Sequence, residues 1–110
     1  MNPELVLVLS NAPDALLAKR IAHYLLEERL AACVNLGAAG LSMYIWQGEM
    51  EGSSEVPLLI KTTRARVPEV IERIKVLHPY EVPEILVLPV IGGFAPYAAW
   101  VHEQTQPLAD

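Results

Sequence analysis

Residues 5–9 read Leu-Val-Leu-Val-Leu, with an apolar residue at every position. A strand with one face in solvent alternates apolar and polar side chains, so this unbroken run predicts a strand that is covered on both faces. The next segment, Ser10-Asn11-Ala12-Pro13-Asp14, has the composition of a helix start: a short polar cap, a proline in the first turn and an acid near the positive end of the helix. The pattern therefore predicts a strand that leads directly into a helix.

The rest of the chain continues this succession of helices and strands. Leu17, Ile21 and Leu25 recur at helical spacing, and residues 41–46 alternate in the manner of a strand. The predicted elements after the first strand are a helix over Ala15–Arg29, a strand over Leu30–Leu36, a hairpin with strands over 41–46 and Glu55–Thr63 joined by the polar connection Gln47–Ser54, a helix from Thr62-Thr63 to Leu77, a strand over Ile85–Ile91 and a helix over Pro96–Gln104.

This order of elements predicts an α+β fold of the ferredoxin-like split βαβ type. In that fold two helices cover one face of an antiparallel sheet, and here a third helix follows at the C-terminus. The length of 110 residues predicts one domain over residues 1–110. The second face of the sheet has no helix to cover it, although the first and last strands are apolar on both sides. Monomers rarely expose large apolar patches, so we expect another copy of the chain to cover this face.

Composition excludes several other classes of protein. Apolar residues make up 53% of the chain, which rules out disorder, and no apolar run approaches the roughly 18–20 residues of a membrane span. The formal charge of −5 argues against a nucleic-acid or anionic-membrane partner. The single Cys33 cannot form an internal disulfide. Because Met1–Glu4 lacks a basic segment and the following apolar run is too short for a signal peptide, we expect a cytoplasmic protein.

The segment His78-Pro79-Tyr80-Glu81-Val82-Pro83-Glu84 is the first candidate site. Its two prolines stiffen the backbone, and imidazole and carboxylate groups are common ligands of divalent metals. The alternative is a plain connection from helix to strand, in which His78 helps to end the preceding helix. The residues alone favour the alternative, because a lone histidine is a poor metal site.

Two other groups of side chains could bind a ligand. Tyr44 and Trp46 share one face of a predicted strand, which favours a protein–protein contact over ligand stacking. Lys61-Thr62-Thr63-Arg64 with Arg66 places basic residues at a helix start, which suits either an anion or a solvated helix face. Cys33 is expected to act as a small buried hydrophobe, with a role as a ligand as the less favoured alternative. No nucleophile, metal-finger, P-loop or dinucleotide motif occurs, so no enzyme class is indicated.

A series of short motifs extends over nearly the whole chain. In order they are Ala12-Pro13-Asp14, Leu30-Ala31-Ala32-Cys33, Tyr44-x-Trp46-x-Gly48, Glu55-Val56, Lys61-Thr62-Thr63, His78-Pro79-Tyr80-x-x-Pro83-Glu84 and Trp100. Each motif is weak alone, but their order resembles the CutA divalent-cation tolerance family. The resemblance implies a small cytoplasmic homotrimer, similar in architecture to the PII signalling proteins, that contributes to tolerance of copper and other divalent cations.

The resemblance also implies site residues. The copper ligands of the bacterial pattern are a cysteine close before Ala-Pro-Asp and two adjacent histidines at His-Pro-Tyr, where this chain has Ser10, Leu77 and His78. Only His78 is retained, so the resemblance implies a weak contact with Cu²⁺ or another divalent cation through His78. The ligand-binding candidates near subunit boundaries map onto Trp46, Glu55, Lys61, Tyr80, Glu84 and Trp100.

The leading hypothesis is therefore a cytoplasmic homotrimeric divalent-cation tolerance protein, without nucleic-acid or membrane partners. The alternative is a PII-like sensor of a small anionic metabolite or nucleotide, which would use Lys61, Arg64 and Arg66. A third hypothesis is a small enzyme in which His78 and Glu84 transfer a proton, although no catalytic motif supports it.

Overall fold

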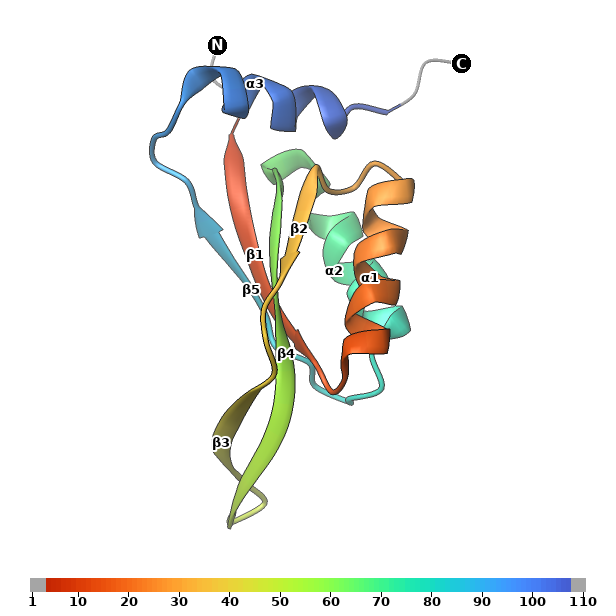
Figure 1. The fold of residues 1–110 in the computed structure, drawn as a ribbon, viewed down its shortest axis with the longest axis vertical. Helices are drawn as coiled ribbons and strands as arrows, with labels where there is room; N and C mark the ends of the chain where they lie inside the picture. Colours follow the sequence, from red (N-terminus) through yellow and green to blue (C-terminus); the bar gives the residue numbers. More distant parts are fainter. Residues whose placement is uncertain (1–3, 108–110) are drawn as a thin grey trace.

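The apolar run at the N-terminus forms β1 (Leu5–Ala12) in the computed structural model, which describes residues 4–107. The other elements are α1 (Ala15–Glu27), β2 (Cys33–Leu36), β3 (Gly40–Trp46), β4 (Glu49–Thr63), the 3-10 helix η1 (Arg64–Arg66), α2 (Val67–Leu77), β5 (Ile85–Pro89) and α3 (Ala95–Gln104). The strands pair in the order β2-β4-β1-β5, and every pairing is antiparallel. Helices α1 and α2 cover one face of this sheet, and α3 crosses one end (Figure 1). This arrangement confirms the predicted ferredoxin-like α+β fold.

The core lies between the sheet and the two covering helices. Val6 and Val8 of β1 point into it because alternate residues of a strand face the same side. Ile21 and Leu25 of α1 pack against them, together with Ile74 of α2. These positions match the apolar periodicity of the sequence, so helical spacing identified the covering helices correctly.

The other face of the sheet is uncovered in the single chain. Leu86 and Leu88 of β5 pair with Leu9 and Leu7 of β1, and these four side chains face away from α1 and α2. Leu86 is 57% exposed and Leu88 is 43% exposed. The expectation that the helices of this chain leave one apolar sheet face bare is therefore confirmed. We call the surface formed by these four leucines the open face.

β3 and the first half of β4 form an arm, residues 40–55, that extends beyond the helices (Figure 1). The sequence predicted a polar connection over Gln47–Ser54, which is wrong because β4 already begins at Glu49. A two-residue turn reverses the chain: Gln47 has φ 51° and Gly48 has φ 81°, and positive φ at both positions is typical of a tight hairpin turn. The polar residues that suggested a loop belong to a strand that is largely exposed in the single chain.

The predicted strand Leu30–Leu36 begins only at Cys33, and the helix before it ends at Glu27 instead of Arg29. Leu30 N–H bonds to the Leu25 carbonyl, and Arg29 N–H bonds to the Leu26 carbonyl. This is the Schellman pattern of helix closure, and Arg29 takes the left-handed conformation with φ 58°. The closure occupies the residues that the sequence assigned to the start of the strand.

Smaller differences concern the other element ends. Asp14 alone caps α1, through a 2.8 Å bond from Leu17 N–H to its carboxylate, while Ser10 remains in β1. The predicted helix from Thr62-Thr63 begins later, because β4 runs to Thr63 and η1 precedes α2. β5 ends at Pro89 on an edge of the sheet, as its proline suggested, and not at Ile91. Within residues 4–107, no helix has both the length and the apolar character needed to cross a membrane.

Candidate functional site

A cavity of about 470 Å³ lies between the arm and the segment that joins α2 to β5. β3 contributes aromatic side chains to it, β4 contributes carboxylates, and the joining segment contributes both kinds. The polar and aromatic residues of the lining are Asn11, Ser42, Tyr44, Trp46, Glu51, Glu55, Tyr80, Glu81 and Glu84, and Met43 and Val82 complete it. None of the described residues that line the cavity is a lysine or an arginine.

His78 holds the joining segment against β1. The imidazole Nε2 donates to the Asn11 carbonyl at 2.7 Å, and Nδ1 accepts the Tyr80 N–H at 3.1 Å. The residue is only 7% exposed, and its ring lies edge-on to the Tyr80 ring with 4.6 Å between centroids. Both ring nitrogens are thus engaged by the backbone. The backbone N–H of His78 also bonds to the Ile74 carbonyl, and this bond ends α2. His78 therefore fixes the position of Tyr80 relative to the cavity.

Glu84 closes the other end of the joining segment. Ser10 Oγ donates to the Glu84 carbonyl at 2.7 Å, and Asn11 Nδ2 donates to the Glu84 carboxylate at 3.2 Å. Ser10 is buried and therefore acts here as a tie between β1 and the segment. Two neighbouring residues of β1 thus position a carboxylate on the wall of the cavity.

Glu55 stands where the arm leaves the body of the sheet. It pairs with Gly40 of β3, whereas the next residue, Val56, pairs with Ala12 of β1. Two effects raise the pKa of the Tyr80 phenol above its ordinary value: first its burial, and second the nearby negative charge of the Glu55 carboxylate. The hydroxyls of Tyr44 and Ser53 lie 3.3 Å apart nearby on the arm. Phenol, hydroxyl and carboxylate groups therefore meet at the base of the arm.

Four of the predicted ligand-binding residues meet at this cavity: Trp46, Glu55, Tyr80 and Glu84. The other two lie outside its lining. Lys61 donates to the Asn35 side chain at 2.6 Å and lines a separate, mainly apolar hollow beside α3. Trp100 lies on α3 next to Tyr97, with 5.6 Å between ring centroids. The single chain therefore does not bring Lys61 or Trp100 to the cavity.

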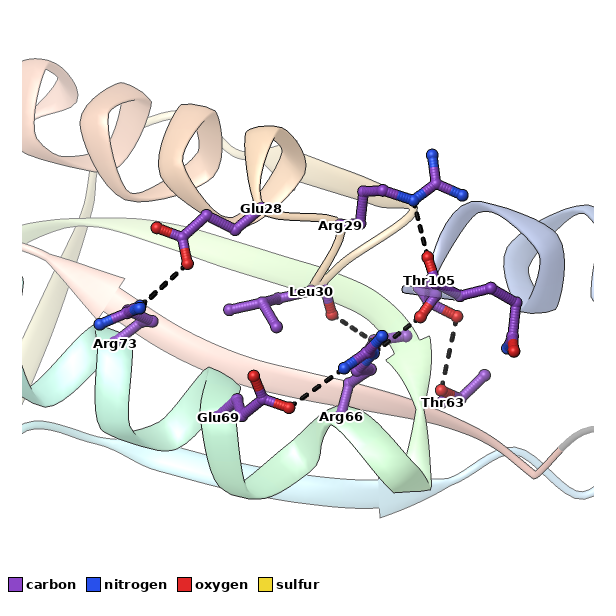
Figure 2. A network of polar contacts seen from close by, with 10 residues as sticks. Glu28, Arg29, Leu30, Thr63, Arg66, Glu69, Arg73 and Thr105 are labelled. Atoms are coloured by element: carbon purple, nitrogen blue, oxygen red, sulfur yellow. Dashed lines mark hydrogen bonds and ion pairs between the residues drawn. The ribbon is translucent and has the colours of Figure 1, made fainter. Parts of the chain in front are cut away.

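The basic group after β4 has partners within the chain. Arg64 pairs with Glu4 at 2.6 Å, and Arg66 pairs with Glu69 at 3.1 Å. Arg66 Nε also donates to the Thr105 carbonyl at 2.7 Å, so the guanidinium joins the start of α2 to the end of α3 (Figure 2). These contacts favour the solvated or structural interpretation of the basic residues over an anion site.

The two positions at which the resemblance implied copper ligands have structural roles in this chain. Ser10 makes the bond to Glu84 described above, and Leu77 packs against the core. Cys33 is half-buried in β2 rather than fully buried as expected. Within residues 4–107, no three His, Cys, Asp or Glu side chains lie close enough together to hold a metal ion.

The sequence did not identify Asn11, Ser42 or Glu51 as lining residues, whereas Glu81 belongs to the first candidate segment. Asn11 could have been found from its place next to Ser10 at the end of β1, where polar residues interrupt an apolar strand. Glu51 could not, because the residues around it were interpreted as a loop. Alternate residues of a strand share a face, which puts Glu51 and Glu55 on the same side. This cannot be inferred when the residues are assigned to a loop.

The chain is similar to several known proteins. Residues 6–104 match the family of the CutA1 divalent ion tolerance protein. The divalent-cation tolerance protein CutA of Thermus thermophilus is 48% identical over 98 residues, which are 89% of this chain and 95% of that protein. The protein of the same name from Pectobacterium atrosepticum is 45% identical over 97 residues, which are 88% of each chain.

Solved structures give the same result. The divalent cation tolerance protein Cut A1 from Thermus thermophilus superposes with a TM-score of 0.91 at 46% identity, covering 93% of this chain and 99% of that one. CutA1 from Oryza sativa superposes with a TM-score of 0.93 at 33% identity, covering 96% of both chains.

Proposed function

Since the chain belongs to the CutA1 divalent ion tolerance family, we propose that it is a cytoplasmic, homotrimeric tolerance protein that responds to copper or another divalent cation. The observation that carries the proposal is the family match over residues 6–104, which includes both the sheet and the cavity. The proposed activity is weak binding of a cation or small ligand near the subunit boundaries, without catalysis.

The open face supports the assembly. Leu7 and Leu9 of β1 lie side by side with Leu86 and Leu88 of the edge strand β5, on the face that α1 and α2 do not cover. Burying such side chains against another subunit removes apolar surface from water, which contributes roughly 25 cal/mol for each Å². The side chains of Leu41, Met43 and Ile45 add exposed apolar surface on the arm. Packing of the open face and arm between three copies is the proposed use of this surface.

The charge distribution supports a positively charged ligand. Glu51, Glu55, Glu81 and Glu84 all line the cavity, whereas Lys61, Arg64 and Arg66 are engaged elsewhere. A concentration of one sign of charge in a cleft raises the local concentration of counter-ions. The same arrangement disfavours an anionic metabolite in this cavity, and no observation favours the PII-like alternative.

A metal contact at His78 would have to replace one of its hydrogen bonds. Nδ1 is the candidate atom, because a metal there displaces only the Tyr80 N–H and leaves the bond from Nε2 to Asn11 in place. The lost bond lowers the net affinity, and Ser10 and Leu77 supply no thiolate or second imidazole. We therefore expect weak Cu²⁺ binding.

Calorimetric titration with Cu²⁺ tests the metal contact. The wild type is expected to bind weakly and His78→Ala to bind more weakly still. His23→Ala removes an exposed imidazole of α1 that takes no part in the proposed contact, and it is expected to match the wild type. Circular dichroism at the titration temperature establishes that each variant is folded. Equal Cu²⁺ affinity of the wild type and His78→Ala would contradict the proposed contact.

A further inference from the structure

The cavity beneath the arm carries negative charge that the chain itself does not balance. Four glutamates line it, and within residues 4–107 none of them forms an ion pair with Lys, Arg or His. The sequence has no Lys or Arg between residues 30 and 60 and none after Lys75. We propose that this cavity binds an organic cation that carries several protonated amines, a linear polyamine. The inference takes the ligand site of the proposed function as its premise and names the ligand's chemistry.

Glu55 is the strongest part of the argument. The residue is only 8% exposed and lies on the cavity wall, yet it has no cationic partner in the described part of the chain. Its polar neighbour is the neutral phenol of Tyr80, whose pKa the carboxylate helps to raise. Taking a carboxylate out of water is costly unless a positive charge accompanies it. A protonated amine in the cavity supplies that charge and donates hydrogen bonds to Glu55.

The aromatic walls favour an organic amine. Tyr44, Trp46 and Tyr80 line the same cavity and remain between 37% and 46% exposed in the single chain. The face of an aromatic ring attracts a cation within about 6 Å of its centre, and tryptophan does so most strongly. The methylene groups between the amines of a polyamine also bury apolar surface against these rings. An inorganic ion gains nothing from that second contact.

The dimensions separate a polyamine from a bare metal ion. A volume of about 470 Å³ is within the range of pockets for small organic molecules, roughly 300–1,000 Å³. The carboxylates are spread along the walls, since no three metal-ligating side chains of residues 4–107 converge on one point. Separate carboxylates fit a ligand whose positive charges are separated by alkyl chains.

Calorimetric titration of the assembled protein with spermidine, a linear triamine, tests the proposal. Glu55→Gln keeps the shape of the side chain and removes its charge, and it is expected to weaken spermidine binding about tenfold or more. Trp46→Leu removes the aromatic face and is expected to weaken binding about threefold to tenfold. Glu72→Gln is the matched control: it makes the same charge change on the exposed surface of α2, where Glu72 lies 3.6 Å from Lys75. The control is expected to stay within about twofold of the wild type.

Melting temperatures give an independent readout. Without ligand, Glu55→Gln is expected to melt at or above the wild-type temperature, because it removes an unbalanced buried charge. Spermidine is expected to raise the melting temperature of the wild type more than that of Glu55→Gln.

Two results would overturn the proposal: no spermidine binding by the wild type, or equal losses in Glu55→Gln and Glu72→Gln, which would indicate attraction to net charge alone. Neither result bears on assembly or on Cu²⁺ binding, which sedimentation and the Cu²⁺ titration measure separately.

Discussion

Replacement of His78 by alanine is expected to destabilise the metal-free protein by about 2–4 kcal/mol. The side chain bonds to the Asn11 carbonyl at 2.7 Å and to Tyr80 N–H at 3.1 Å, and the residue is 7% exposed. Each hydrogen bond contributes about 1 kcal/mol net, and a buried partner left without a bond costs about 1–3 kcal/mol. The upper part of the range applies if water does not enter the vacated space.

The assay is urea unfolding in the presence of a chelator, at one protein concentration because the stability of an assembly depends on it. His23→Ala is the control, since the His23 imidazole is 79% exposed and pairs with Glu27 at 3.2 Å on the surface of α1. We expect the control to change stability by less than about 0.5 kcal/mol. A loss below about 0.5 kcal/mol in His78→Ala would refute the reasoning, because it would mean that neither backbone bond contributes to stability.

Three other predictions concern Tyr80, the sheet and α1. Burial and the Glu55 carboxylate raise the pKa of Tyr80, so the folded state holds its proton at higher pH than the unfolded chain does. The contribution of Tyr80 to the free energy of unfolding is therefore complete below the pKa of the unfolded chain and is lost as pH rises through the pKa of the folded state. Ultraviolet titration should show a lower Tyr80 pKa in Glu55→Gln than in the wild type. That pKa should still lie above the ordinary value, because burial remains. Gly37→Ala should cost about 1–3 kcal/mol in urea unfolding, since a new Cβ would lie 2.7 Å from Pro57 Cγ, and an unchanged midpoint would contradict the packing. Asp14→Ala should cost about 1 kcal/mol by losing the cap of α1, whereas Asp14→Asn should retain most of it.

Much of the fold could be predicted from local patterns. The apolar run at residues 5–9 and the helical spacing of Leu17, Ile21 and Leu25 identified a central strand and its covering helix. These patterns succeed because each records which side of an element is buried. The first half of β4 was missed for the same reason, although β3 of the arm was predicted: residues 49–54 are almost all exposed in the single chain, so their strand conformation leaves no apolar alternation to detect. The start of β2 was predicted too early because the helix before it closes at Arg29, a position where a glycine would usually indicate the end of a helix.

The candidate site was predicted in part. The stiff segment from His78 to Glu84 drew attention by its composition, and Tyr80 and Glu84 do line the cavity. Its partners come from β1, β3 and β4, and their convergence follows from strand pairing rather than from any local motif. Nor could the sequence show that both nitrogens of His78 bond to the backbone, because that depends on where β1 ends relative to the loop.

Sedimentation of the native protein tests most directly the claim that the open face of the sheet is an assembly interface. We predict a particle of three times the chain mass of 12.1 kDa at micromolar concentration. Burying the exposed parts of Leu86 and Leu88, 57% and 43% of each residue, contributes about 1 kcal/mol for each side chain. Leu86→Glu with Leu88→Glu replaces that gain by the cost of burying charge, so the double variant should sediment as a folded monomer. A wild type that sediments at 12.1 kDa, or a double variant that remains trimeric, would contradict the claim.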